Sequence, residues 1–299
     1  SRLVHDVSDN VILFQSLQMR CAMLEKDTHE ILAYYDGGAE IGRLERGIGK
    51  IELERSKEII SRYLSESTHV IYDIGGGIGV YSSWLAELGY EVHLFDLSPQ
   101  AIEFARQQQL NNPNISKLET ADARNLDRKD ESADIVLLMG PLYHLTEQKE
   151  RVKALQEAAR VLKKGGTLIT SAISRFGSLL WGLSVYGERN TIVEEDAFMD
   201  MVRQELTDGQ HVRPAAYPSF IARSYFHTSD TLRADWQAAG LPEPRVLGVE
   251  GPIWIAPGFE EKWAVPFHRS RLLDISRQVE EQESVIGMSP HMLAVGTKS

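Results

Sequence analysis

The chain has 299 residues, a formal net charge of −11 and a hydrophobic content of 42%, which is ordinary for a globular protein. The acidic balance argues against a nucleic-acid partner, because proteins that bind polyanions usually carry basic patches. No apolar run approaches the roughly 20 residues that span a bilayer, and Cys21, the single cysteine, allows neither an intramolecular disulfide nor a thiolate zinc site within one chain.

Residues 1–44 come before the strongest sequence pattern, and we expect them to form a helical cap. Apolar side chains between Val11 and Met19 offer this cap a packing surface, and residues 34–38 (YYDGG) indicate a turn. Arg43 and Arg46 alternate with acidic residues, so we interpret them as solvated helix charges or cofactor contacts.

The most informative segment is VIYDIGGGIGVYS, residues 70–82. It predicts a short buried strand closed by Asp73, followed by a glycine-rich turn into a helix. The glycines of this turn are Gly75, Gly77 and Gly79. The helix should bury Tyr81, Trp84, Leu85 and Leu88 and end at Gly89. Glycines at a strand-to-helix turn let a ligand approach the backbone closely.

A second strand, residues 91–95, ends in Asp96 and Leu97. An acid about 20 residues after a glycine turn can hold a ribose. A purely structural alternative is that Asp96 only supports the start of the next helix, although Ser98 and Pro99 already form a good helix start. Both roles are compatible, and a nucleoside-containing ligand is the first hypothesis.

The identity of the nucleoside depends on Val80. A dinucleotide fingerprint needs Gly or Ala at that position, and the chain has no phosphate-binding G-x-x-x-x-G-K-[ST] loop. An acid at Asp73 disfavours a pyrophosphate and can receive an amino group, directly or through water. In D-x-G-x-G-x-G followed by Asp96, the chain resembles class I methyltransferases, which bind S-adenosylmethionine.

This resemblance covers residues 40–172 well and 224–299 more loosely. It implies an α/β fold with a doubly wound, mostly parallel seven-stranded sheet of the Rossmann-like type. It also implies that the three glycines cradle the methionine part of S-adenosylmethionine and that Asp96 holds its ribose. Asp122, with Ala123 beside it, would accept from the adenine amino group, although surface aspartates after strands are common. One of Tyr34 and Tyr35 would reach the methionine end, and Met139 is a further cofactor-binding candidate.

The pattern continues as alternating strands and helices, which argues for a parallel sheet. Strands are predicted at residues 116–120, 133–138 and 167–171. A helix with Val152, Leu155 and Leu162 inward is expected to end at a turn, residues 163–166. The Lys163–Lys164 pair in that turn is then explained by the helix dipole.

The loop after the fourth predicted strand is G-P-L-Y-H-L, residues 140–145. In this fold it presents groups to the methyl acceptor, so Tyr143 and His144 are the candidate catalytic residues. His144 could take a proton near neutral pH, or its ring could simply pack beneath a lid. The loop lacks the [N/D]-P-P-[Y/F] motif of enzymes that methylate planar nitrogens. It resembles a bacterial subgroup that acts on small molecules, many of them secondary metabolites.

Outside the predicted core (residues 45–172), two insertions stand out. Residues 173–223 are rich in aromatic side chains and are expected to form a lid over the substrate pocket. The rest of the core, residues 224–299, holds an insertion at about 252–280 with Trp254, Trp263 and Phe267. The end of the chain, residues 288–297, should be the family's antiparallel final strand.

The leading hypothesis is a cytoplasmic S-adenosylmethionine-dependent methyltransferase for a small molecule, without membrane or nucleic-acid partners, as a monomer or homodimer. The alternatives are a protein or RNA methyltransferase and a non-catalytic nucleoside-binding protein, and Val80 disfavours an NAD enzyme. The histidines show no metal-binding spacing, so no metal is expected; a site built from His144, His227 and His291 is a minor alternative.

Overall fold

The computed structural model describes residues 29–34, 38, 41–108 and 115–299. Its centre is a seven-stranded sheet in the order β3-β2-β1-β4-β5-β9-β8. The strands of this sheet are β1 (Val70–Ile74), β2 (Glu91–Asp96), β3 (Ile115–Thr120), β4 (Ala133–Leu138), β5 (Leu162–Ile173), β8 (Arg245–Gly248) and β9 (His291–Thr297). The doubly wound, mostly parallel sheet that the sequence predicts is therefore confirmed.

Strand pairing places the carboxyl ends of β1 to β5 at one edge of the sheet. β1 pairs in parallel with β2 and β4, and β4 pairs in parallel with β5. β9 runs antiparallel to both β5 and β8, as expected for the final strand. Its first residue, His291, lies opposite Ile173, the last residue of β5. The amino end of β9 thus reaches the same edge as the carboxyl ends of the parallel strands.

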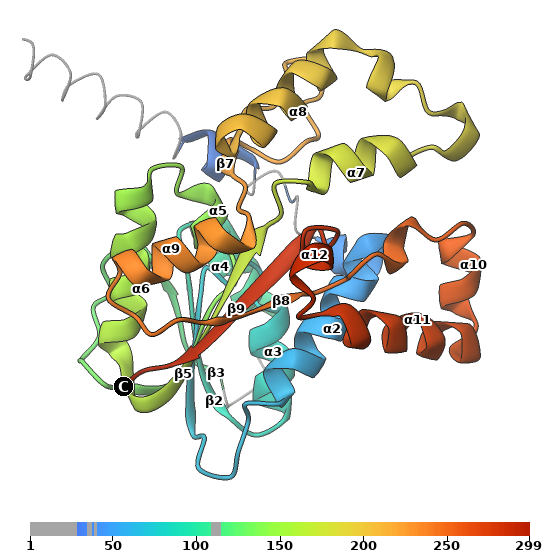
Figure 1. Ribbon diagram of the computed structural model, residues 1–299. Coiled ribbons are helices and arrows are strands. Elements are labelled where there is room, and N and C mark those ends of the chain that lie inside the picture. Colours follow the sequence, from blue (N-terminus) through green and yellow to red (C-terminus); the bar gives the residue numbers. More distant parts are fainter. Residues whose placement is uncertain (1–28, 35–37, 39–40, 109–114) are drawn as a thin grey trace, which may run out of the picture.

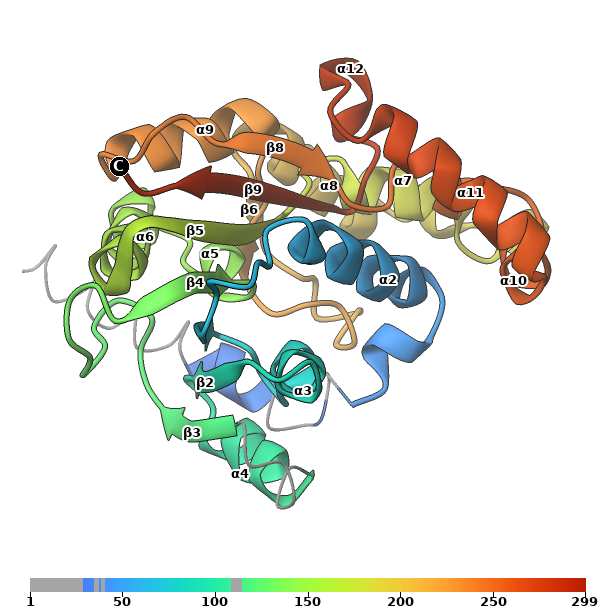
Figure 2. The same ribbon diagram turned by 90° about the horizontal axis from the view of Figure 1, so that it is seen from below.

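Helices cover both faces of the sheet (Figures 1 and 2). One face carries α2 (Ile48–Ser61), α3 (Val80–Glu87) and α4 (Pro99–Gln108), and the other carries α6 (Gln148–Val161) and α9 (Ser229–Ala238). β1 and β4 are buried along most of their length, which explains their nearly continuous apolar sequence. No helix among the described residues is long and apolar enough to cross a bilayer.

Two sequence predictions fail at the ends of helices. Leu88, expected on the buried face of α3, is 55% exposed, because α3 ends at Glu87 and Leu88 is its C-cap residue. The predicted turn at residues 163–166 is the irregular first part of β5, where the register to β4 shifts. Lys163 pairs with Asp134 of β4 at 2.6 Å, so an ion pair explains this lysine, not a helix dipole.

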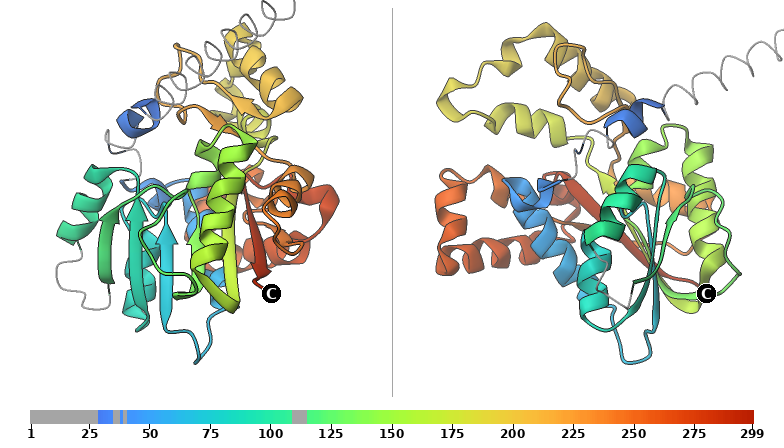
Figure 3. Two further views of the ribbon diagram at one scale, coloured as in Figure 1. Left: turned by 90° about the vertical axis from the view of Figure 1, so that its left-hand side faces the viewer. Right: turned by 180° about the vertical axis from the view of Figure 1, so that it is seen from behind.

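The insertion at residues 173–223 stands over the carboxyl edge of the sheet (Figures 1 and 3). Its elements are α7 (Gly177–Ser184), η2 (Gly187–Arg189), η3 (Ile192–Glu194), α8 (Asp196–Asp208) and β6 (Gln210–His211), which pairs with β7 (Ser224–Tyr225). Ile192, Phe198, Met201 and Val202 form its own small core, against which Trp181 and Tyr217 pack. A buried core of this kind means that the insertion has a defined structure of its own.

The second insertion lies between β8 and β9 and packs beside α2 (Figure 1). Its elements are η4 (Ile253–Ile255), α10 (Phe259–Ala264), α11 (Pro266–Val279) and α12 (Glu283–Ile286). Trp254 and Trp263 are buried with Ile51 of α2, whereas Phe267 is exposed. Of the expected cap, residues 29–34 are helical and η1 (Arg43–Glu45) leads into α2; most of the rest lies outside the described residues.

Candidate functional site

A cavity of about 250 Å³ opens at the carboxyl edge of β1, β2, β3 and β4. Seven of the predicted cofactor-binding residues and both predicted catalytic residues line it: Gly75, Gly77, Asp96, Leu97, Asp122, Ala123, Met139, Tyr143 and His144. The fold thus brings together motifs that the sequence places tens of residues apart. Of the two tyrosine candidates, Tyr35 lies outside the described residues, and Tyr34 is not among the residues that line the cavity.

The glycine-rich loop lies directly against the loop that follows β4. Gly75 has a φ of +72°, and a Cβ at this position would lie 2.4 Å from Cδ of Pro141. The close approach is mutual, since a Cβ on Gly140 would lie 2.7 Å from the carbonyl oxygen of Gly75. Gly79 does not line the cavity; with a φ of +80° it is the N-cap residue of α3. The glycines therefore serve both loop packing and an open backbone surface.

Asp73 lies beneath this loop, not in the cavity. Its side chain is fully buried and accepts a hydrogen bond from the Ser82 hydroxyl at 2.7 Å. Burial raises the pKa of Asp73 to about 6, and the nearby Asp96 carboxylate adds to this, although the Ser82 hydrogen bond opposes it. The idea that Asp73 receives a ligand's amino group directly does not fit this position. Ser82 lies in α3, and a Cβ on Gly76 would lie 2.5 Å from the Asp73 side chain, so Asp73 supports the turn between β1 and α3.

Asp96 ends β2 at the wall of the cavity. One carboxylate oxygen accepts from the Gly77 N–H and the other from the Ser98 N–H, both at 2.8 Å. These two backbone donors fix the plane of the carboxylate, while each oxygen has further lone pairs for a ligand's hydroxyl groups. Ser98 accepts from the Ala101 N–H at 3.1 Å, so the helix α4 has its own cap. Capping does not explain Asp96, and its position fits a diol ligand.

Asp122 lines the cavity after β3, paired with Arg124. The Arg124 guanidinium contacts both oxygens of Asp122, at 2.6–3.1 Å, and also reaches Glu150 at 2.7 Å. Burial alone would raise the pKa of Asp122, but Arg124 holds it below its usual range. The carboxylate is therefore ionised and can accept a hydrogen bond from a ligand amino group.

Tyr143 and His144 belong to the short helix α5 (Pro141–His144), where their rings contact edge to face. The Tyr143 hydroxyl donates to the Met139 carbonyl at 3.4 Å. Burial lowers the pKa of His144 to about 3, and the charge of His211 lowers it further. A hydrogen bond with the backbone of Arg223 acts in the opposite direction. His144 is neutral near pH 7, but its weak basicity disfavours it as a general base.

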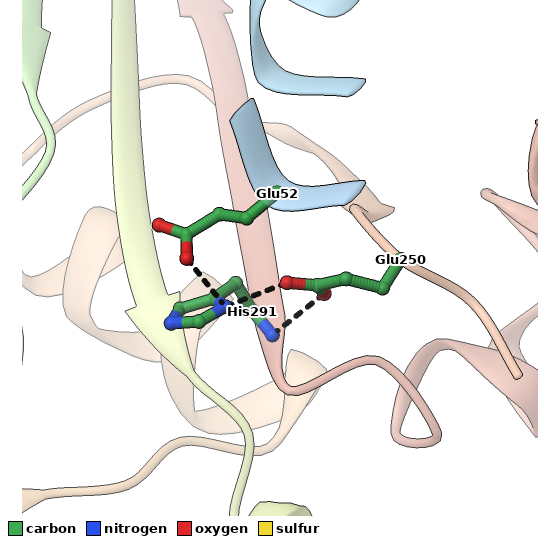
Figure 4. A group of neighbouring side chains, drawn as sticks. All are labelled: Glu52, Glu250 and His291. Atoms are coloured by element: carbon green, nitrogen blue, oxygen red, sulfur yellow. Dashed lines mark hydrogen bonds and ion pairs between the residues drawn. The ribbon is translucent and has the colours of Figure 1, made fainter. Parts of the chain in front are cut away.

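Two further polar residues line the cavity, Arg43 and Glu52, which form a bidentate ion pair with distances of 2.6 and 3.0 Å. The sequence pointed to Arg43 as a helix charge or cofactor contact, but Glu52 was not predicted. Glu52 also lies near His291 and Glu250 (Figure 4). Glu52, Glu250 and His291 come from three distant parts of the chain, so no local spacing could reveal them.

The three histidines considered for a metal site are held in separate environments. His227 contacts Asp235 at 3.1 Å, His291 contacts Glu250 at 2.7 Å, and His144 lies on α5. Among the described residues, the group able to offer three ligand atoms to a cation is Glu52, Glu250 and His291, within 4.8 Å of one another.

The cavity fits a nucleoside cofactor without a pyrophosphate. Asp96 and Asp122 place carboxylates at the ends of adjacent strands, where a ribose and a purine amino group can each find an acceptor. Gly75 and Gly77 expose backbone beside them, and Met139 adds an apolar surface. The acidic walls repel phosphate groups, which agrees with the sequence argument against dinucleotides.

A comparison with protein families matches residues 72–170 to a methyltransferase domain, the Methyltransf_11 family. The match begins in β1 and ends in β5, so it covers every strand whose carboxyl end borders the cavity.

Curated relatives match the same part of the chain. It is 32% identical over 119 residues to the glycine/sarcosine N-methyltransferase of Parasynechococcus marenigrum, covering 39% of this chain and 42% of that protein. It is 33% identical over 115 residues to the ubiquinone/menaquinone biosynthesis C-methyltransferase UbiE of Neisseria meningitidis, covering 38% and 46%. The methyltransferase GfsG of Streptomyces halstedii is 30% identical over 130 residues, covering 42% and 46%. The chain spans less than half the length of these relatives.

Solved structures extend the likeness to most of the chain. A SAM-dependent methyltransferase from Methanosarcina mazei aligns with a TM-score of 0.52 and 20% identity, covering 80% of this chain and 96% of that one. An S-adenosylmethionine-dependent methyltransferase from Mesorhizobium loti aligns with a TM-score of 0.52 and 16% identity, covering 82% and 98%. These likenesses establish the fold. The family match adds that residues 72–170 resemble a methyltransferase domain.

Proposed function

We propose that this protein transfers the methyl group of S-adenosylmethionine to a small-molecule acceptor. The observation that carries the proposal is a single cavity lined by Asp96 and Asp122, by the glycine loop, and by Tyr143 and Glu52. Such a cavity can hold a cofactor and an acceptor side by side. The G-P-L-Y-H-L loop supports a small acceptor, as in the bacterial subgroup that it resembles.

The residues that line the cavity have distinct roles in this proposal. Asp96 holds the ribose hydroxyls, Asp122 accepts from the adenine amino group, and the backbone at Gly75 and Gly77 lies along the methionine part. The bound cofactor supplies an electrophilic methyl group on a sulfonium, and the electron pair of the broken carbon–sulfur bond stays on sulfur. The chain's task is to align the acceptor, exclude water and remove a proton where the acceptor carries one.

We further propose that residues 173–223 act as a lid on this cavity. The insertion stands over the carboxyl edge of the sheet, and its Arg213 pairs with Glu30 at 3.1 Å, next to Ile31 and Leu32 of the cavity wall. Binding of S-adenosylhomocysteine should slow amide hydrogen exchange within residues 196–211. Equal exchange with and without this ligand would show that the insertion is fixed structure.

An RNA methyltransferase is the second candidate, because the chain is 29% identical over 102 residues to a probable tRNA methyltransferase 9B of Bos taurus. The net charge of −11 works against it, since phosphate contacts need exposed Lys and Arg. The test is transfer of labelled methyl from S-adenosylmethionine to a panel of amines, phenols, thiols and carbon acids, beside bulk tRNA. Label in a small molecule supports the proposal, and label in tRNA alone would overturn it.

A further inference from the structure

Three polar side chains from distant elements meet at the carboxyl end of β5 (Figure 4). Glu52 comes from α2, Glu250 from the segment after β8, and His291 from the start of β9. Glu250 is fully buried and Glu52 nearly so, while 18% of the His291 side chain is exposed. Burying two carboxylates is costly unless they are paired and hydrogen-bonded. The hydrogen-bond partners of these carboxylates therefore indicate the role of the cluster.

Glu250 fixes both the position and the tautomer of His291. One carboxylate oxygen lies 2.7 Å from Nδ1 of the ring, and the other accepts from the His291 backbone N–H at 3.0 Å. A carboxylate at that distance from Nδ1 requires the proton to be on Nδ1. The neutral ring therefore has its lone pair on Nε2, which has no hydrogen-bond partner within the described part of the chain.

His291 is linked to the cavity through Glu52. Figure 4 shows Nε2 directed away from Glu250, and the second Glu52 oxygen directed away from Nδ1. That oxygen accepts from Arg43 at 3.0 Å, and both Glu52 and Arg43 line the cavity. The other Glu52 oxygen lies 3.6 Å from Nδ1. His291 therefore lies next to Glu52, a residue of the cavity wall.

We propose that His291, oriented by Glu250, is the proton acceptor for the molecule that is methylated. The inference rests on the proposed function. An acceptor X–H bound beside Glu52 gives its proton to Nε2: the X–H bond breaks, an N–H bond forms, and the electron pair stays on X. X then carries the lone pair that takes the methyl group. The imidazolium that results lies between two carboxylates, which stabilise its charge.

The electrostatics favour His291 over His144 in this role. Burial alone would lower the pKa of His291, but Glu52 and Glu250 raise it above its usual value. The charge of Arg43 lowers it by a smaller amount. His144 has a pKa near 3 and is a far weaker base. A general base works best when its pKa lies close to the working pH.

The same three side chains could also be considered as a cation site, and their contacts disfavour it. Both Glu52 oxygens are engaged by Arg43, and both Glu250 oxygens are engaged by His291. Burial would raise the pKa of Glu52, but Arg43 and His291 lower it to about 2, so its charge is already compensated without a metal.

The first test needs no acceptor and uses diethylpyrocarbonate, which modifies neutral imidazole nitrogens. The protein is loaded with S-adenosylhomocysteine, and modified peptides are quantified between about pH 5.5 and 8.5. We expect modification of His291 with a midpoint above the usual histidine pKa, moving down by about one pH unit in Glu52→Gln. An unmodified His291, in a sample where the exposed His268 reacts, would overturn the proposal.

The second test measures methyl transfer to the compound that is labelled in the acceptor panel. His291→Gln should lower kcat/KM by about 10²–10⁴-fold and remove the acidic limb of the pH profile. Binding of S-adenosylhomocysteine should be unchanged, which shows that the variant is folded. The matched control, His268→Gln, should retain full activity.

The outcomes of these tests separate the two proposals. Activity of His291→Gln within a few-fold of the original protein, with the same pH profile, would exclude His291 as the base. If no panel compound is labelled, the proposed function fails, and the diethylpyrocarbonate result still decides whether Nε2 of His291 can accept a proton.

Discussion

Two carboxylates at opposite ends of the parallel sheet, Asp134 and Asp73, are held in opposite ways. At the amino end, Asp134 accepts hydrogen bonds from two backbone N–H groups at 2.8 and 2.9 Å and pairs with Lys163. Burial would raise the pKa of Asp134, but Lys163 and the backbone donors lower it. At the carboxyl end, burial raises the pKa of Asp73 to about 6, and Ser82 is its one side-chain donor.

This difference separates a carboxylate that stabilises the fold from one that supports the ligand site. The carboxylate at the amino end is placed where charge and hydrogen bonds stabilise the folded chain. At the carboxyl end, Asp73 supports a glycine loop whose shape the ligand requires, at a cost to stability. Substitutions at the amino end should therefore change mainly the free energy of unfolding, whereas substitutions at the carboxyl end should also change ligand binding.

The largest effect is expected for Gly75→Ala, compared with Gly89→Ala. Both glycines have a positive φ, but a Cβ at Gly75 meets Pro141, whereas nothing lies within 4 Å at Gly89. Backbone strain should cost each variant about 1–2 kcal/mol, and overpacking should add about 1–3 kcal/mol for Gly75→Ala. Urea unfolding measures the difference. Gly75→Ala should also lose binding of S-adenosylhomocysteine, and equal behaviour of the two variants would contradict the loop geometry.

The two carboxylates should respond oppositely to neutralisation. Because the folded-state pKa of Asp73 is raised from 3.8 to about 6, its contribution to stability falls as the pH rises through that range. Asp73→Asn should therefore increase the free energy of unfolding by roughly 2–3 kcal/mol at pH 7, and hardly at all near pH 4. Asp134→Asn should decrease it at pH 7, because its folded pKa is lowered. Parallel urea titrations at both pH values check the signs.

A smaller loss is expected when Asp96 is replaced. A hydrogen bond to a charged group is worth roughly 1.5–3 kcal/mol, so Asp96→Ala should weaken binding of S-adenosylmethionine by about tenfold or more. Asp127→Ala removes an exposed carboxylate outside the cavity and is the control. Calorimetry that gives equal dissociation constants for the two variants would remove Asp96 from the site.

The smallest change is expected for His144→Gln. With a pKa near 3 the ring contributes packing and a polar contact, and turnover should fall by less than about tenfold. A loss of about 10²–10⁴-fold, with cofactor binding intact, would instead make His144 the base and would contradict the role given to His291.

The cofactor half of the site could be predicted because its signals are local. Gly75, Gly77 and Asp96 lie within one strand–helix–strand unit, and strand-terminal positions put Asp122 at the same edge. The predictions for Leu88 and Lys163 were wrong. The exposure of Leu88 depends on where α3 ends, and the partner of Lys163 depends on which strand lies next to β5. The pairing of Glu52, Glu250 and His291 could not be predicted, since it arises only when β9 returns antiparallel beside β5.

The most direct test of the account is calorimetric titration of the unmodified protein with S-adenosylhomocysteine, S-adenosylmethionine and NAD. The cavity at the carboxyl edge predicts that both sulfur compounds bind at a single site per chain, because Asp96 and Asp122 receive their ribose and adenine groups. NAD should not bind, since its pyrophosphate would meet acidic walls. Binding of NAD, or no binding of either sulfur compound, would contradict the account.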